Sequence, residues 1–125
     1  MTPFQHWLAL AIAGAVGTLA RAGVTGAAVR LVGTTYPWGT LVVNVVGAFA
    51  FGAIVGVSRS RLPLAHGLDT IVLVGLLGGF TTFSSYAFQT VELWESGRPA
   101  LAAGYAIGSN LLGFVAVWAG LQLVR

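Results

Sequence analysis

The stretch that decides the fold is GGFTTFSSY, which runs from Gly78 to Tyr86. It follows the apolar run 71–77 and combines two glycines, four hydroxyl residues and three aromatic rings. Glycine weakens a helix because it loses more backbone entropy on folding than other residues. The hydroxyls of Thr81 and Thr82 compete for the hydrogen bonds of the backbone. The sequence therefore predicts a helix that is broken within this stretch.

The composition around the stretch is that of a membrane protein. The chain has 125 residues, of which 57% are hydrophobic and 7% are charged, whereas soluble domains contain about 25% charged residues. It has no lysine and no cysteine, which excludes a disulfide framework and a thiolate metal site. The six arginines are scattered and form no basic run, so a nucleic-acid partner is not expected.

Four apolar segments are expected to cross the bilayer, at residues 6–29, 38–57, 70–93 and 100–124. Each reaches the roughly 20 residues that a helix needs to span the hydrocarbon. The first segment is too long for a signal-peptide core and has no basic residues before it, so we expect it to remain in the protein. The predicted fold is a single all-α integral membrane domain over residues 1–125, with four transmembrane helices. Its third helix is predicted to be broken at mid-membrane, where unwound backbone must be covered by protein or by a cavity.

Two polar side chains lie deep inside the first two spans. Arg21 carries the one charge deep inside a span, and such a charge either faces a protein interior or aqueous vestibule, or reaches the interface along its own long side chain. Asn44 lies near the centre of the second span. Its amide either bonds a neighbouring helix or donates to a passing anion.

The third span offers a possible anion path after its break. Phe83 and Tyr86 are three residues apart, so their rings share a face if the helix resumes. The edge of an aromatic ring is electropositive, and two such edges would form a narrow slot for a small anion, with Thr82 and Ser85 adding hydroxyl donors. A packed aromatic pair with back-bonded hydroxyls is the alternative.

The fourth span carries a polar stripe. Tyr105 and Ser109 are four residues apart and share one helix face, whereas Asn110 lies about 100° further round and is expected to point elsewhere. This stripe lines a path or forms a seam between helices, and the spacing alone does not separate the two.

Catalysis is not expected. The acidic residues and the histidines lie at span ends, namely Asp69, Glu92, Glu95, His6 and His66. No carboxylate lies at mid-membrane to couple protons, and no nucleophile–base pair or metal cluster can be assembled.

The charge balance leaves orientation nearly undecided. One side of the membrane receives three arginines, Arg59, Arg61 and Arg125, and the other receives two, Arg30 and Arg98. The positive-inside rule needs a clearer excess to fix topology. The protein therefore inserts either with a weak bias or in both orientations, pairing with its inverted copy. Small residues such as Gly104 and Gly108 are spaced for close helix contact, which favours a dimer.

Four segments, in this order, resemble the Fluc (CrcB) family of fluoride channels over essentially the whole chain. They are GAVGTLARAGV, PWGTLVVNVVGAFAFG, GLLGGFTTFSSY and YAIGSNLLG, which begin at Gly14, Pro37, Gly75 and Tyr105. The resemblance implies an antiparallel, dual-topology homodimer with two pores. It also implies passive, fluoride-selective conduction that exports toxic cytoplasmic fluoride across the inner (plasma) membrane.

The resemblance also implies roles for particular residues. Phe83 would present its ring edge to the ion, Asn44 would be a pore-lining amide, and Arg21 would face the vestibule. Polar groups along the path would be Thr82, Ser85, Tyr105 and Ser109. The backbone carbonyls of Gly78 and Thr81, from both protomers, would hold a central structural Na⁺.

The chain departs from the family pattern at two positions. Tyr86 stands where a second phenylalanine is usual, and Gln89 stands where many members have an acid. Two other functions remain as alternatives: a small dual-topology multidrug exporter, and a non-conducting scaffold subunit of a membrane complex.

Overall fold

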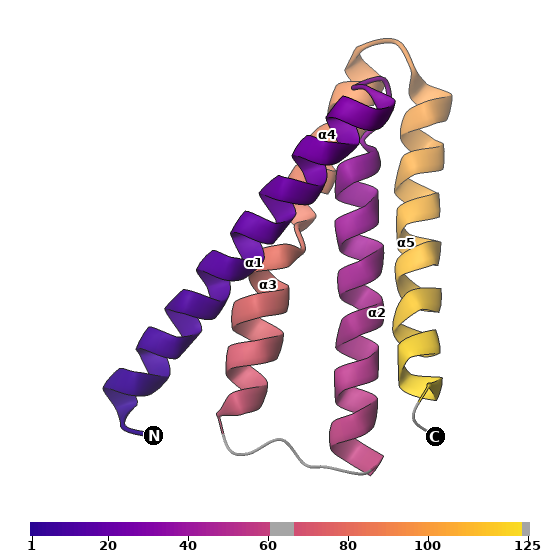
Figure 1. The fold of residues 1–125 in the computed structure, drawn as a ribbon. Helices are drawn as coiled ribbons and strands as arrows, with labels where there is room; N and C mark the ends of the chain where they lie inside the picture. Colours follow the sequence, from indigo (N-terminus) through magenta and orange to yellow (C-terminus); the bar gives the residue numbers. More distant parts are fainter. Residues whose placement is uncertain (61–66, 124–125) are drawn as a thin grey trace.

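The computed structural model describes residues 1–60 and 67–123. Predictions that concern residues 61–66 and 124–125, including Arg61, His66 and Arg125, lie outside these ranges. The described elements are helical (Figure 1): α1 (Pro3–Val32), α2 (Trp38–Ser60), a π-helix η1 (Thr70–Leu77), α3 (Gly78–Phe80), α4 (Phe83–Glu95) and α5 (Pro99–Gln122).

Four helical segments of the described chain are long and apolar enough to cross a membrane. They cover Pro3–Val32, Trp38–Ser60, Thr70–Glu95 and Pro99–Gln122, which confirms the four predicted spans to within a few residues at the ends described. The boundaries have local causes. Thr2 forms a capping box with Gln5 before α1, and Gly33, which has a φ of 80°, ends that helix.

The helices pack chiefly with partners that are not their neighbours in sequence. α1 slants across η1 and α3, and α2 runs alongside α5 (Figure 1). A smaller contact joins α4 to α5, which follows it in sequence. The start of α1 and the end of α5 lie at the same end of the bundle (Figure 1), as four spans require. The third span is thus shared between two packing groups, one on each side of its break.

The third span is broken as predicted, but not at its glycines. Gly78 and Gly79 are helical, and the extended residues are Thr81, with φ −88° and ψ 164°, and Thr82, with φ −154° and ψ 118°. Ahead of the break, residues 70–77 form a π-helix, a rare conformation that is frequent at functional sites. Sequence periodicity had not indicated this π-helix.

The glycine at position 79 serves close packing instead. A Cβ atom built there would lie 2.5 Å from the carbonyl oxygen of Gly14 and 3.2 Å from the amide nitrogen of Thr18. Both atoms are backbone of α1 and cannot rotate away. The absence of a side chain therefore allows the third span to contact α1 just before the break.

Replacing Gly79 by alanine is expected to lower the stability of the protein. The new methyl group would overpack the contact with α1, which typically costs about 1–3 kcal/mol. Gly23→Ala is the matched control because nothing lies within 4 Å of a Cβ at that position, and there alanine should be neutral or stabilising. Thermal unfolding in detergent measures both. Equal unfolding temperatures for the two variants would contradict the packing role of Gly79.

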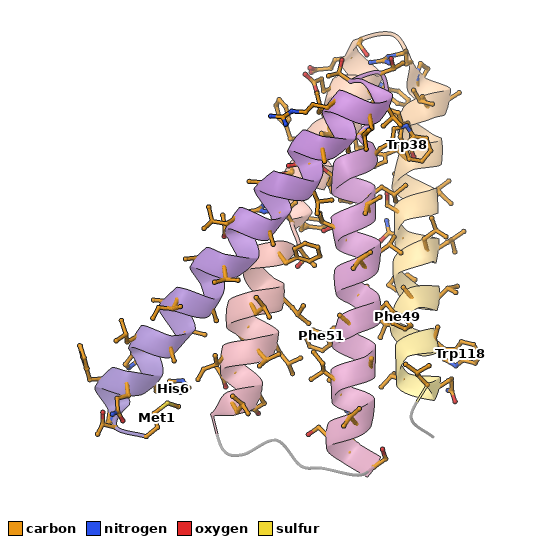
Figure 2. The ribbon with its side chains drawn as sticks, in the orientation of Figure 1. Met1, His6, Trp38, Phe49, Phe51 and Trp118 are labelled. Carbon is orange, nitrogen blue, oxygen red and sulfur yellow. The ribbon has the colours of Figure 1, made fainter. Side chains whose placement is uncertain are left out.

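Much of the apolar surface of the single chain is open, as a membrane protein allows. Tyr105 and Val43 are the largest fully buried side chains among the described residues. Trp118 is 63% exposed and points away from the helices (Figure 2). Phe51 points toward the space between α2 and the first half of the third span (Figure 2), where it lines an open groove.

Candidate functional site

The side chain of Asn44 on α2 holds the broken backbone. Its Oδ1 accepts a hydrogen bond of 2.7 Å from the Thr82 amide, and its Nδ2 donates one of 2.9 Å to the Thr82 carbonyl. One amide thus satisfies both backbone groups of an extended residue that is itself buried. Such groups would otherwise be costly at membrane depth. Of the two sequence-based interpretations of Asn44, the interhelical bond is observed, and the second N–H of its amide remains available as a donor.

The break leaves two backbone carbonyls without their helical donors. In a continuous helix the Gly78 carbonyl would accept from the amide of Thr82, four residues on, but that amide donates to Asn44. The Thr81 carbonyl would accept from the amide of Ser85, but that amide donates to the Thr82 hydroxyl at 3.2 Å. The two carbonyls to which the family resemblance assigns a cation are therefore those whose regular helical donors are diverted.

The second half of the span, α4, begins at mid-bundle with its positive end there. Thr82 is its N-cap residue, and the Thr82 and Ser85 hydroxyls lie 3.1 Å apart in a hydrogen bond. The first amides of a helix lack intrahelical partners, and its dipole favours negative charge at this end. The break therefore presents carbonyls from one helix and an anion-favouring terminus from the next.

Arg21 lies beside this terminus in a polar cavity. The cavity has a volume of about 320 Å³, and its lining residues are Thr18, Arg21, Ala22, Thr25, Thr40, Thr82, Ser85 and Gln89. Arg21 is the one charged residue in that lining, which contains no carboxylate. Of the two alternatives for Arg21, this position is the one expected of a side chain that faces a vestibule, and its role there stays a prediction. The cavity is electropositive and offers hydroxyl and amide groups that can donate hydrogen bonds.

A second cavity, of about 210 Å³, leads from the first toward the loop between α1 and α2. The two share Thr25, Thr40 and Gln89 in their linings. The outer cavity also contains Tyr36 and Arg98, and Arg98 donates to the Thr35 carbonyl at 2.8 Å. A tyrosine phenol is neutral at physiological pH and can donate a hydrogen bond, and burial raises the pKa of Tyr36 further.

An aromatic cluster lies on the other side of α4. The ring centroids of Phe83 and Tyr86 are 5.6 Å apart with planes tilted by 51°, and Tyr86 is 5.4 Å from Tyr105. Tyr105 also meets the ring of Tyr36 edge-on at 5.4 Å. The prediction that the rings of Phe83 and Tyr86 share a face is confirmed. Phe83 is 78% exposed in the single chain, so its ring has space on one side for another molecule.

The polar stripe on α5 is only partly satisfied. Tyr105 is fully buried, and its hydroxyl donates to Gln89 Oε1 at 3.0 Å. Within the described part of the chain, Ser109 Oγ is buried and has no hydrogen-bond partner. A buried hydroxyl usually has one, so Ser109 is the one member of the stripe whose hydrogen bond the described chain does not supply.

The predicted site residues other than Ser109 thus fall into three groups within one chain. Arg21, Thr82 and Ser85 share the polar cavity, and Phe83, Tyr86 and Tyr105 form the aromatic cluster. The open groove is lined by Asn44, Gly47, Ala48, Phe51, Leu73, Leu77, Gly78, Thr81 and Val117. Thr82 links the cavity to the groove, because its side chain lines the former and its backbone bonds Asn44 of the latter.

Two contributing residues were not foreseen. Gln89 lines both cavities and fixes the hydroxyl of Tyr105. Asn110 was expected to point away from the stripe, and no partner was named for it; its Nδ2 lies 2.8 Å from the Tyr86 hydroxyl on α4. Gln89 lies three residues after Tyr86, which is the spacing of one helix face, and that signal could have identified it. Nothing in the sequence linked Asn110 to a residue 24 positions earlier.

The fold and the site define a class: small four-span helical membrane proteins whose broken third span faces a polar, electropositive cavity. Residues 8–121 match the family model described as CrcB-like protein, Camphor Resistance (CrcB). The chain belongs to this family, as the four sequence segments had indicated.

Proteins named "Fluoride-specific ion channel FluC" are similar to the chain over nearly its full length. The protein of Nitratidesulfovibrio vulgaris is 42% identical over 121 residues, which cover 97% of this chain and 98% of the relative. That of Nitrosococcus oceani is 43% identical, covering 94% and 92%. That of Agrobacterium fabrum is 41% identical, covering 93% of each.

Proposed function

We propose that this protein is a fluoride-specific ion channel that passively exports fluoride from the cytoplasm across the inner (plasma) membrane, and that it is not an enzyme. The observation that carries the proposal is the cavity in which Arg21 faces the N-terminus of α4, with Thr82 and Ser85 beside it. A guanidinium, a helix N-terminus and hydroxyl donors together replace the hydration of a small anion. The names of the relatives support fluoride as that anion.

The acidic residues argue against a proton-coupled exporter. Asp69 caps the start of η1, and Glu92 and Glu95 lie in the last turn of α4, so all three are at span ends. A transporter that couples drug export to protons needs a membrane-embedded carboxylate. A scaffold subunit would use its polar side chains only for packing, and such a role does not account for the polar cavity around Arg21.

The functional unit we propose is an antiparallel homodimer of inverted protomers with two pores. A fourth-span face supports it: a Cβ built at Gly104 or Gly108, four residues apart, would meet nothing within 4 Å, so these small residues pack against no part of the described chain. Helices in lipid associate through such surfaces. The near balance of arginines supports insertion in both orientations.

The dimer would also complete a cation site. No group of three or more histidine, cysteine or acidic residues lies together in the described ranges, so a resident cation would need backbone oxygens. Gly78 and Thr81 supply two carbonyls whose helical donors are diverted. Both residues line the open groove, so a second copy seated there would bring the number to four. Unwound carbonyls of this kind suit Na⁺, which we propose as a structural ion at the dimer centre.

Fluoride efflux from liposomes tests the proposed function. Vesicles loaded with potassium fluoride and containing the purified protein should release fluoride rapidly once valinomycin is added, and should retain chloride under the same conditions. Imposing a proton gradient should not be required. Release of chloride at a similar rate, or no release from folded protein, would contradict the proposal.

Adding three lysines to the N-terminus is expected to lock the protein in one orientation and to abolish efflux from cells. Charges in short flanking segments set topology, and protomers with the same orientation cannot form an inverted pair. Co-expressing a copy with three lysines in the loop between α1 and α2 should restore activity. Full activity from a chain shown to have a single orientation would contradict the inverted dimer.

A further inference from the structure

We infer that Asn110 is a positioning residue that fixes the Tyr86 ring in the ion path of this channel. This inference rests on the proposed function. Asn110 Nδ2 donates to the Tyr86 hydroxyl and to the Ala106 carbonyl, both at 2.8 Å. The Tyr86 hydroxyl donates in turn to the same carbonyl at 3.2 Å. The three groups form a closed hydrogen-bonded triangle between α4 and α5.

The triangle uses every proton that its members can donate. A phenol has one donor and a primary amide has two. The phenol proton is directed to Ala106, and the two amide protons are directed to Tyr86 and Ala106. The Tyr86 hydroxyl is therefore not a ligand for an anion. What this residue offers to an ion is its ring edge.

The triangle also fixes where that edge points. The Tyr86 ring is tied to α4 by its Cβ and to α5 by its hydroxyl, so both ends of its long axis are held. On either side it contacts another aromatic ring, Phe83 at 5.6 Å and Tyr105 at 5.4 Å. A tilt of Tyr86 would therefore disturb the exposed ring of Phe83 as well.

Asn110 matters because the ring at position 86 carries a hydroxyl. Without Asn110 the Tyr86 hydroxyl keeps only its 3.2 Å hydrogen bond to the Ala106 carbonyl, and the ring is held to α5 by one hydrogen bond instead of two. In apolar surroundings the loss of a polar partner is costly, so the phenol oxygen needs the Asn110 amide as its donor. A phenylalanine ring has no such need. Asn110 should consequently be required when residue 86 is tyrosine and dispensable when it is phenylalanine.

A double-mutant cycle tests this dependence through fluoride efflux from liposomes. The four proteins are wild type, Asn110→Leu, Tyr86→Phe and the double variant. We expect Tyr86→Phe to conduct like wild type. Asn110→Leu should lose about three- to tenfold in efflux, the range expected for one lost hydrogen bond, and should also leak more chloride. Adding Asn110→Leu to Tyr86→Phe should change neither quantity.

Equal losses from Asn110→Leu in both backgrounds, or no loss in either, would overturn the inference. So would failure of the Tyr86→Phe protein to conduct while folded and dimeric, because the hydroxyl would then be an ion ligand. Asn110→Ser replaces the leucine variant if that variant does not fold. If wild type itself does not conduct fluoride, the proposed function fails. The same cycle on thermal unfolding then decides the positioning role, which requires Asn110→Leu to lower the unfolding temperature less in the Tyr86→Phe background, where it removes only the bond to the Ala106 carbonyl.

Discussion

Replacing Asn44 by leucine is expected to abolish fluoride efflux and to destabilise the protein together. Leucine fills a similar volume but leaves the buried amide and carbonyl of Thr82 without the partners they have at 2.7 and 2.9 Å. Each unsatisfied buried group costs about 1–3 kcal/mol. The Thr82 amide would then be free to return to the Gly78 carbonyl, which would close the break and remove the N-terminus of α4 from the cavity.

Asn44→Asp is the matched control for this prediction. A carboxylate accepts from the Thr82 amide as asparagine does, but it cannot donate to the Thr82 carbonyl and it repels an anion. We expect it to unfold at a temperature between those of wild type and Asn44→Leu, and to conduct no fluoride. Thermal unfolding and liposome efflux measure the two effects. A leucine variant that conducts and unfolds like wild type would contradict the holding role of Asn44.

Phe83→Ile is expected to remove conduction with little effect on stability. The Phe83 ring is 78% exposed in the single chain, so isoleucine loses few contacts within the protomer. It does lose the electropositive ring edge and the contact with Tyr86. Efflux should fall at least about tenfold, equivalent to about 1.4 kcal/mol in the barrier to permeation.

The chain offers a matched control for this variant on the same helix. Phe88 is also on α4 and is 67% exposed, but it lies five residues further on, about 140° round the helix axis. Phe88→Ile makes the same chemical change on another face, where the aromatic cluster does not lie. It should retain efflux. Equal losses for the two variants would show that conduction depends on bulk at the surface of α4 rather than on a ring in the path.

What the sequence could predict was set by strong and local signals. Transmembrane helices are easy to recognise in a sequence because each needs a mainly apolar stretch long enough to cross the bilayer. All four such stretches were found. The break was also predicted, because Thr81 and Thr82 follow two glycines. The exact residues of the break were harder to predict, because a glycine in a helix can either weaken that helix or allow another helix to pack closely against it. At Gly79 the second reason applies, as the Gly14 carbonyl shows.

What could not be predicted depends on contacts between distant residues. The sequence showed that Asn44 needs a partner, but the partner is the backbone of a residue 38 positions later, and any residue type there would serve. The same holds for Asn110, whose helix angle relative to Ser109 was right but whose neighbouring helix was unknown. A π-helix at 70–77 was not predictable either, because its composition is that of any apolar helix.

The pairing of α2 with α5, and of α1 with the third span, has a consequence for synthesis at the ribosome. When α1 or α2 leaves the translocon, the span that is its main packing partner has not yet been synthesised, because that partner is not the next one in sequence. Asn44 enters the membrane 38 residues before Thr82, which is about 2–8 s at a translation rate of 5–20 residues per second. During that interval the Asn44 side chain lacks the Thr82 backbone groups to which it is hydrogen-bonded in the folded protein. A nascent chain truncated before residue 82 should therefore keep α2 close to the translocon, and its release into lipid should coincide with the arrival of the third span.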